Sequence, residues 1–154
     1  MTPKSLLRSA QVASPLETLI DGRFAEILDD PAPPEKPERL VFCSGKIYWE
    51  LVEERERTGS PAALVRVEQF YPFPDAAFAE VADRYHGVQN VVWAQEEPRN
   101  RGGWTFMVPH LSEIFPNHEI QFAGRPPSAS PATGSLRVHR EQQEAVIRAA
   151  LGAV

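Results

Sequence analysis

The chain has 154 residues, the length of one domain, and its hydrophobic fraction of 42% is enough to form a buried core. A net charge of -5 offers no basic surface to nucleic acid. No apolar run approaches the ~20 residues of a membrane span, and the first residues lack the apolar stretch of a secretory signal. Cys43 is the single cysteine, which excludes an internal disulfide framework, and the four histidines have no zinc-ligand spacing. We therefore expect a cytoplasmic protein.

Four prolines between residues 31 and 37 indicate a stiff, extended segment in the first part of the chain. We therefore expect two parts: an N-terminal arm with a proline-rich linker, residues 1–37, and an α/β domain, residues 38–154. Within the first part, residues 24–28 could add an antiparallel strand at the edge of a sheet.

Apolar runs alternate with helical periodicities through the second part of the chain. The runs predict four strands: Leu40–Cys43, Ala63–Val67, Val91–Ala94 and Glu119–Ala123. The periodicities predict four helices: from Ile47 to Gly59, from Pro72 to Gly87, from Gly103 to Ile114 with Pro109 either as a kink or as the true start, and from Leu136 to Leu151. This order favours an α/β fold with a mostly parallel sheet and helices on both faces. Because no GxGxxG follows the first strand, the sequence does not predict a dinucleotide site.

The turn after the first predicted strand has the features of an anion site. Ser44 can cap the following helix, the free backbone N–H groups there attract an anion, and Lys46 adds a positive charge. Arg66 is a charged residue in the second predicted strand, and if the two strands are neighbours, Arg66 and this turn could face one phosphate. The alternative is an ordinary helix cap, with Arg66 paired to Glu68 or Glu96. The full phosphate-loop pattern is absent.

The third predicted strand leads into a polar run, Gln95–Trp104, at the edge where open α/β sheets usually carry their function. Glu96 and Glu97 are not expected to form an acid–base pair, because adjacent strand residues point to opposite faces. We expect them to support a shared interface, or to bind nearby backbone N–H groups or arginines. Trp104 follows two glycines and is expected to anchor the loop in the core or at an interface.

Three other segments accompany this run: Val41–Lys46, Val65–Pro74 and Gly124–Gly134. Together and in this order, the four segments resemble the C-terminal domain of the E1 component of 2-oxoglutarate dehydrogenase, over nearly the whole chain. The resemblance implies a three-layer fold of the transketolase C-terminal type. The related 2-oxoadipate enzymes share these motifs, so the resemblance does not fix the substrate of the parent enzyme.

The resemblance also implies an activity for the parent enzyme. That enzyme decarboxylates 2-oxoglutarate on thiamine diphosphate with Mg²⁺ in the tricarboxylic acid cycle, and passes the succinyl group to a lipoyl-bearing E2 succinyltransferase. The cofactor is held by preceding domains across a homodimer interface, so we expect this chain alone to bind no cofactor and to be inactive. The partners implied are the remaining E1 domains, a second subunit and E2.

Some bacterial relatives bind acetyl-CoA on this domain as an allosteric ligand. The resemblance places Ser44 and Arg66 in that site, with Lys46 beside them and Thr2 as a further candidate. Two other hypotheses stay open. The chain could be a free-standing α/β module that binds an anionic metabolite, or a purely structural domain that dimerises through the Gln95–Pro98 loop and binds no ligand. The fragment hypothesis predicts exposed apolar surface around Trp104 and Phe106.

Overall fold

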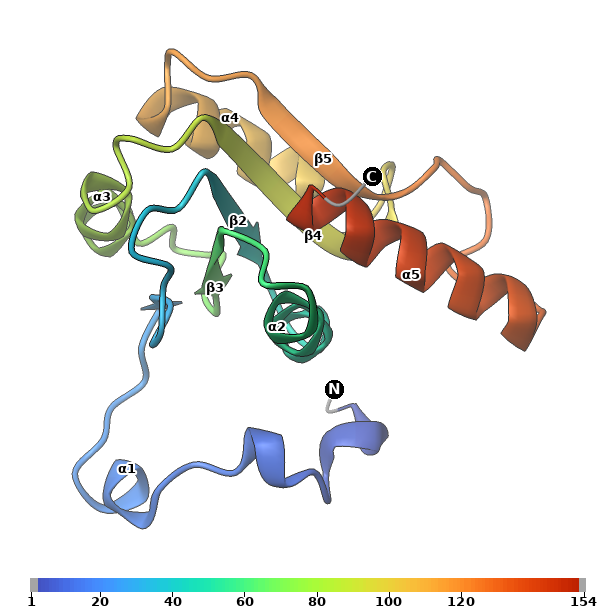
Figure 1. Cartoon of the computed structure of the whole chain (residues 1–154), viewed down its shortest axis with the longest axis horizontal. Helices are drawn as coiled ribbons and strands as arrows, with labels where there is room; N and C mark the ends of the chain where they lie inside the picture. The colour runs from blue at the N-terminus through green and yellow to red at the C-terminus, as the bar shows by residue number, and fades with distance from the viewer. Residues whose placement is uncertain (1–2, 153–154) are drawn as a thin grey trace.

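Five strands form one sheet at the centre of the protein. The computed structural model describes residues 3–152. The sheet has the order β1-β3-β2-β4-β5 (Figure 1), and β1 alone runs antiparallel to its neighbour. The strands are β1 (Ile27–Leu28), β2 (Arg39–Cys43), β3 (Ala62–Val67), β4 (Asn90–Pro98) and β5 (Ile120–Arg125).

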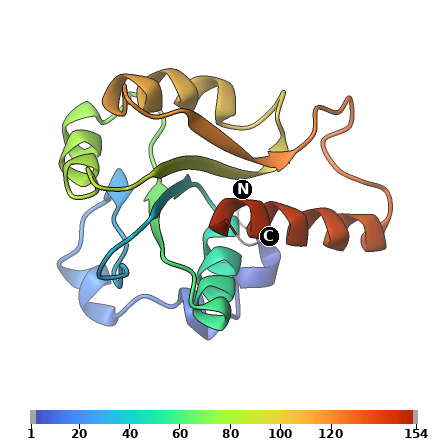
Figure 2. The same ribbon diagram turned by 45° about the horizontal axis from the view of Figure 1, so that its top comes forward.

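Helices cover both faces of the sheet and produce three layers (Figure 2). One face carries α2 (Ile47–Thr58) and α5 (Leu136–Leu151), and the other carries α3 (Asp75–Asp83) and α4 (Trp104–Ile114). The predicted α/β class and the mostly parallel sheet are therefore confirmed. No helix within residues 3–152 is long and apolar enough to cross a membrane.

The central strands are apolar on both sides because each side faces a helix layer. In β2, Leu40 and Phe42 belong to the core beneath α3 and α4, whereas Val41 and Cys43 belong to the core beneath α2 and α5. All four side chains are fully buried. A strand buried on two faces reads as a continuous apolar run rather than as an alternation, which is why four consecutive apolar residues sufficed to predict it.

Three features of the strands and helices add detail to the predictions from sequence. β4 continues past Ala94, the predicted end, to Pro98, and it pairs with β5 again at Arg125 after a register shift. Pro109 lies inside α4, so it does not mark the start of that helix, which begins at Trp104. The expected antiparallel edge strand is present as β1, with Ile27 opposite Val67.

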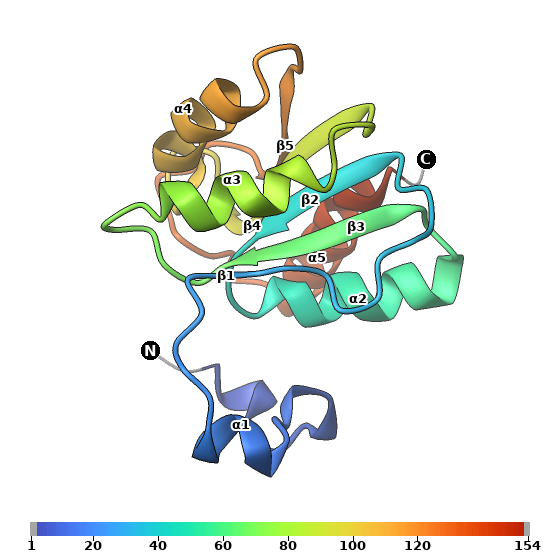
Figure 3. The ribbon, with the colours of Figure 1, turned by 90° about the vertical axis from the view of Figure 1, so that its left-hand side faces the viewer.

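The N-terminal arm, residues 3–24, lies outside the three layers and next to the α2 side of the body (Figure 3). It consists of two short 3-10 turns, Lys4–Leu6 and Ala10–Val12, and the five-residue helix α1, Leu16–Ile20. Most of the large exposed apolar side chains of the described chain belong to it: Leu7, Leu16, Leu19, Ile20 and Phe24. The boundary between residues 37 and 38 stays a prediction.

A buried ion pair attaches the linker to the body. The Asp30 side chain is fully buried and pairs with Arg55 of α2. Its carboxylate also accepts hydrogen bonds from the backbone N–H groups of Leu64, at 2.8 Å, and Ala32, at 3.0 Å. Arg55 donates a further bond to the carbonyl of Ala62, at 3.4 Å. One carboxylate thus joins the linker, α2 and the outer side of β3.

We predict that Asp30→Ala strongly destabilises the protein. The substitution leaves the buried Arg55 guanidinium without a counter-charge, and removing one partner of a buried pair typically costs ~3–5 kcal/mol. Urea unfolding measures the loss of unfolding free energy. The matched control is Glu141→Ala in the exposed Arg137–Glu141 pair, where ~1 kcal/mol or less is expected. Equal losses in the two variants would contradict the assignment.

Candidate functional site

The candidate site lies at the carboxyl ends of β2, β3 and β4. The chain leaves β2 for β3 on one side and later returns to β4 on the other side of β2. After β2 it enters α2 on one face of the sheet, and after β4 it enters α4 on the opposite face. This is the topological switch point, outside which open α/β sheets form a crevice for ligands.

A pocket of about 450 Å³ opens at this point between the ends of β2 and β4. We call it the switch-point pocket. Its walls come from the turn after β2, the segment after β3, the end of β4 and the start of α4. The lining residues are Ser44, Gly45, Phe70, Trp93, Gln95, Glu97, Gly102, Gly103 and Phe106.

The amide of Gln95 fixes the geometry of this pocket. Its side chain is 3% exposed, and its oxygen accepts hydrogen bonds from the Trp93 indole N–H, at 2.8 Å, and from the backbone N–H of Trp104, at 2.9 Å. Its nitrogen donates to three carbonyls along the loop: those of Glu97, Pro98 and Arg101, at 3.2, 3.2 and 2.7 Å. One side chain therefore holds both ends of the loop between β4 and α4.

Two glycines let the loop close around this amide. Gly102 has φ of +67°, and a Cβ there would lie 2.9 Å from Nε2 of Gln95. At Gly103 a Cβ would lie 2.7 Å from the rings of both Phe70 and Trp93. Any side chain at these positions would need the ring or the amide to move, so the close approach depends on glycine.

We predict that Gln95→Leu loosens this loop and destabilises the fold. The change leaves the Trp93 indole N–H and the Trp104 backbone N–H without partners, each costing about 1–3 kcal/mol when buried. The loss of unfolding free energy in urea should therefore be on the order of 2–4 kcal/mol. The control is Gln121→Leu on β5, an exposed glutamine, with a loss of about 0.5 kcal/mol or less. A loss at Gln95 no larger than at Gln121 would refute the role.

A second pocket, of about 470 Å³, lies between the N-terminal arm and the α2 side of the sheet. We call it the arm pocket. Lys46, Trp49, Arg66 and Glu68 line it from the body, and arm residues close the other side: Pro3, Leu6, Leu7, Ser9, Val12 and Ala13. Lys46 and Arg66, which the sequence proposed for an anion site, therefore share one pocket.

Ser44 does not join them. It lines the switch-point pocket on the other side of the turn, and Gly45 is the residue that borders both pockets. The predicted helix cap is wrong: Lys46 occupies the cap position of α2, and no side chain makes a capping hydrogen bond there. Ser44 and Arg66 are separated because side chains alternate along a strand: Cys43 faces the same side of the sheet as Arg66, and the next residue, Ser44, faces the other side. Thr2 lies outside the described residues.

Both cations of the arm pocket already have partners. Lys46 forms ion pairs with Glu50 and, at 3.4 Å, with Glu96. Arg66 lies 3.7 Å from the Glu68 carboxylate, which matches the alternative of local pairing, and its guanidinium stacks over the ring of Tyr48, at 4.4 Å. An anion entering this pocket would have to compete with these carboxylates.

Glu96 and Glu97 point to opposite sides of β4, as expected. Glu96 is half-buried and bonded to Lys46 and to Gln143 of α5, whereas Glu97 is exposed at the rim of the switch-point pocket. Trp104 is 8% exposed and packs in the core against Phe122. Of the apolar surface expected around Trp104 and Phe106, Phe106 is exposed, at 37%, whereas Trp104 is buried because the Gln95 bond draws the start of α4 inward.

A buried polar cluster behind Glu96 escaped the sequence analysis. Arg125 donates hydrogen bonds to the carbonyl of Glu96, at 2.7 Å, to the Gln143 side chain, at 2.8 Å, and to Nδ1 of His139, at 3.2 Å. Gln143 precedes Val146 and Ala150 on the buried side of α5, so helical periodicity was a signal that could have placed it there. The cluster holds α5 against the end of β4.

Cys43 is not a candidate nucleophile. It is fully buried at the end of β2, and burial raises the pKa of its thiol to about 12 even though the nearby Arg66 charge lowers it. The reactive thiolate is therefore scarce at neutral pH, as for a structural cysteine.

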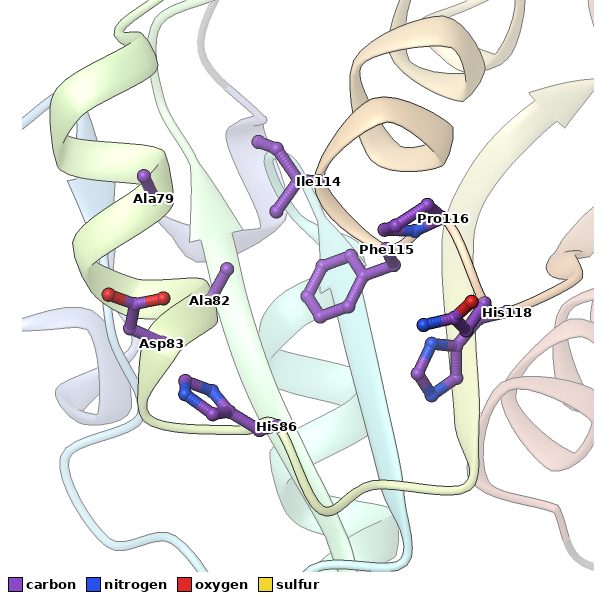
Figure 4. Close-up of a pocket in the computed structure, with 9 residues that line it drawn as sticks. Ala79, Ala82, Asp83, His86, Ile114, Phe115, Pro116 and His118 are labelled. Atoms are coloured by element: carbon purple, nitrogen blue, oxygen red, sulfur yellow. The ribbon is translucent and has the colours of Figure 1, made fainter.

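A third pocket, of about 440 Å³, lies at the opposite end of the sheet, between α3 and α4 (Figure 4). Asp83 and His86 line its α3 side, and Phe115 and His118 line the side formed by the segment after α4. His118 binds the carbonyl of Val88 through Nε2, at 2.9 Å. Within residues 3–152, no group of three histidine, cysteine or acidic side chains could hold a metal ion.

The sheet order, the two helix layers and the crevice at the switch point define an α/β domain of the transketolase type. A solved structure of a split-gene transketolase, described as an inactive beta4 tetramer, matches with a TM-score of 0.53 at 20% identity, over 78% of this chain and 40% of that chain. The family model described as 2-oxoglutarate dehydrogenase C-terminal matches residues 13–151. The chain belongs to this family.

Curated relatives of this chain are named 2-oxoglutarate dehydrogenase E1 components. The chain is 44% identical to the 2-oxoglutarate dehydrogenase E1 component of Azotobacter vinelandii over 96% of its length, and 43% identical to that of Geobacillus kaustophilus over 98%. In each case the match covers 16% of the relative. The chain thus spans about one sixth of the length of these curated relatives.

Proposed function

We propose that the chain serves as the C-terminal domain of a 2-oxoglutarate dehydrogenase E1 component. In this role it would be one domain of an enzyme that oxidatively decarboxylates 2-oxoglutarate. That enzyme passes the succinyl group to a lipoyl-bearing E2 in the tricarboxylic acid cycle. The observation that carries the proposal is the family match over residues 13–151. The identity of 44% to an E1 component over 96% of the chain supports it.

The residues of this chain do not fit thiamine diphosphate with Mg²⁺. A diphosphate with Mg²⁺ needs positive charge around its phosphates, but no lysine or arginine lines the switch-point pocket, and both cations of the arm pocket are paired with glutamates. We therefore derive no step through the cofactor, and we propose that the remaining E1 domains bind it. The contribution of this chain is structural: Gln95 holds the loop after β4 in one conformation at the switch point.

The arm supports a role in assembly. Leu16, Leu19 and Ile20 are spaced as one side of a helix and are 65%, 78% and 69% exposed, and contiguous apolar surface of this kind marks an interface. We propose that the arm contacts other parts of E1, either in the same subunit or across a homodimer. We also propose that the protein acts in the cytoplasm, which fits a chain with Cys43 as its single cysteine.

The proposal is tested by grafting. We predict that an E1 of Azotobacter vinelandii whose own C-terminal domain is replaced by this chain keeps most of its activity. The activity is measured as 2-oxoglutarate-dependent NADH formation after reconstitution with E2 and with the dehydrogenase that reoxidises the lipoyl group. Deletion of the domain without replacement should abolish that activity. A folded, dimeric graft without activity, or a deletion variant that stays active, would refute the proposed function.

Acetyl-CoA binding in the arm pocket is a second candidate, because Lys46 and Arg66 line one cavity. The same observation favours the alternative of a free-standing module for an anionic metabolite. We predict that isothermal titration of the chain with acetyl-CoA gives heat of binding. The variant Arg66→Ala should lose this heat. The control Arg137→Ala should keep it, because Arg137 is exposed on α5. No heat with the unaltered chain would argue against a self-contained site.

A further inference from the structure

The switch-point pocket has a chemistry that neither the family nor the proposed function assigns. Along one face of β4, an aromatic ring, an amide and a carboxylate follow each other at Trp93, Gln95 and Glu97. Trp93 and Gln95 are buried and form the floor, at 1% and 3% exposure. Glu97 stands at the rim and is exposed.

Among the polar groups of this pocket, the Glu97 carboxylate is a charge without an ion-pair partner in the described residues. All the hydrogen-bonding capacity of the Gln95 amide is used within the chain, since its two N–H groups are shared among three carbonyls and its oxygen accepts two bonds. No lysine or arginine lines the pocket, and no cation among residues 3–152 pairs with the Glu97 carboxylate. Its neighbour Glu96, by contrast, is bonded to Lys46 and Gln143.

Three aromatic rings, including Trp93 in the floor, make up the apolar lining of the same pocket. The Phe70 ring lies 6.0 Å from that of Trp93, nearly perpendicular to it, and 5.9 Å from that of Phe106. Phe106 is 37% exposed, so one wall is open to the surface. Aromatic faces beside an unpaired carboxylate attract a cation that can stack and also donate hydrogen bonds.

We propose that the switch-point pocket binds an arginine side chain presented by a segment of a partner protein. A guanidinium is planar, stacks on aromatic rings and donates paired hydrogen bonds to a carboxylate, whereas an ammonium group is a compact, strongly hydrated charge. Ser44 also lines the pocket, and its hydroxyl is a group that can act as a second acceptor.

The pocket favours an arginine within a polypeptide over free arginine. Free arginine brings its own carboxylate, for which the pocket has no basic side chain, and its own ammonium group, which would compete with the guanidinium for Glu97. In a peptide that carboxylate is an amide, which introduces no charge. The glycines at 102 and 103 and the Gln95 bonds fix the pocket before binding, so little ordering is needed.

The test is a titration of the whole chain with the capped residue N-acetyl-arginine-N-methylamide. Binding is followed by NMR through the indole N–H signals of Trp93, in the pocket floor, and Trp49, which lines the arm pocket and serves as an internal control. The expected result is a saturable shift at Trp93 and none at Trp49. Capped citrulline, the uncharged isostere, should give no saturable shift, and capped lysine and free arginine should bind more weakly than capped arginine.

Two matched variants decide the assignment. Glu97→Gln should raise the Kd for capped arginine by about tenfold or more, since it removes the charge that faces the pocket. Glu96→Gln, on the other face of β4, should leave the Kd unchanged. Unaltered binding in Glu97→Gln, equal binding of capped citrulline, or no shift at Trp93 would overturn the proposal. If free arginine bound more tightly than capped arginine, the proposal that the arginine belongs to a polypeptide would be wrong.

Discussion

The carboxyl edge of this sheet depends on the five hydrogen bonds of the Gln95 amide. Without them, the indole of Trp93 and the first backbone N–H of α4 would be buried without partners. The same amide binds carbonyls on both sides of the turn, so it positions Glu97 at the rim and Trp104 in the core. The shape of the switch-point pocket therefore follows from one neutral side chain, and charged residues only border it.

The opposite sides of β4 use polar residues differently. Beneath α5, Arg125, Gln143 and Glu96 bind one another, and Lys46 joins them from the start of α2. Positive and negative groups are matched there, as a half-buried site requires. On the other side, Glu97 has no such cation among the described residues. This contrast between two adjacent glutamates is the basis on which we propose a partner at the Glu97 side of β4 and none at the Glu96 side.

The sequence predicted the sheet and its helices well because their signals are local. The apolar run Leu40–Cys43 and the helical spacing of Leu136–Leu151 appear at those places in the structure. The end of β4 was missed because Gln95–Pro98 is polar, and the alternation that predicts a strand requires apolar residues on one face. What buries Gln95 is its bonding to a loop that approaches from later in the sequence, and no local pattern records that.

The candidate site was predicted only in part, for a similar reason. Lys46 and Arg66 were expected together and do line one pocket. Ser44 was expected with them, but a one-residue step along the chain places it on the other side of the sheet. Their ion pairs with Glu50 and Glu68 depend on rotamers and distances that spacing does not specify.

The ion pair between Asp30 and Arg55 also decides how this sheet ends. β1 covers β3 only at Val67 and Arg66, so the rest of that strand would present free backbone groups to another chain. Asp30 occupies the Leu64 N–H and Arg55 occupies the Ala62 carbonyl. Two charged side chains thus take the place of a longer β1 and block the edge of β3 against pairing with another chain, by which exposed edges start aggregation.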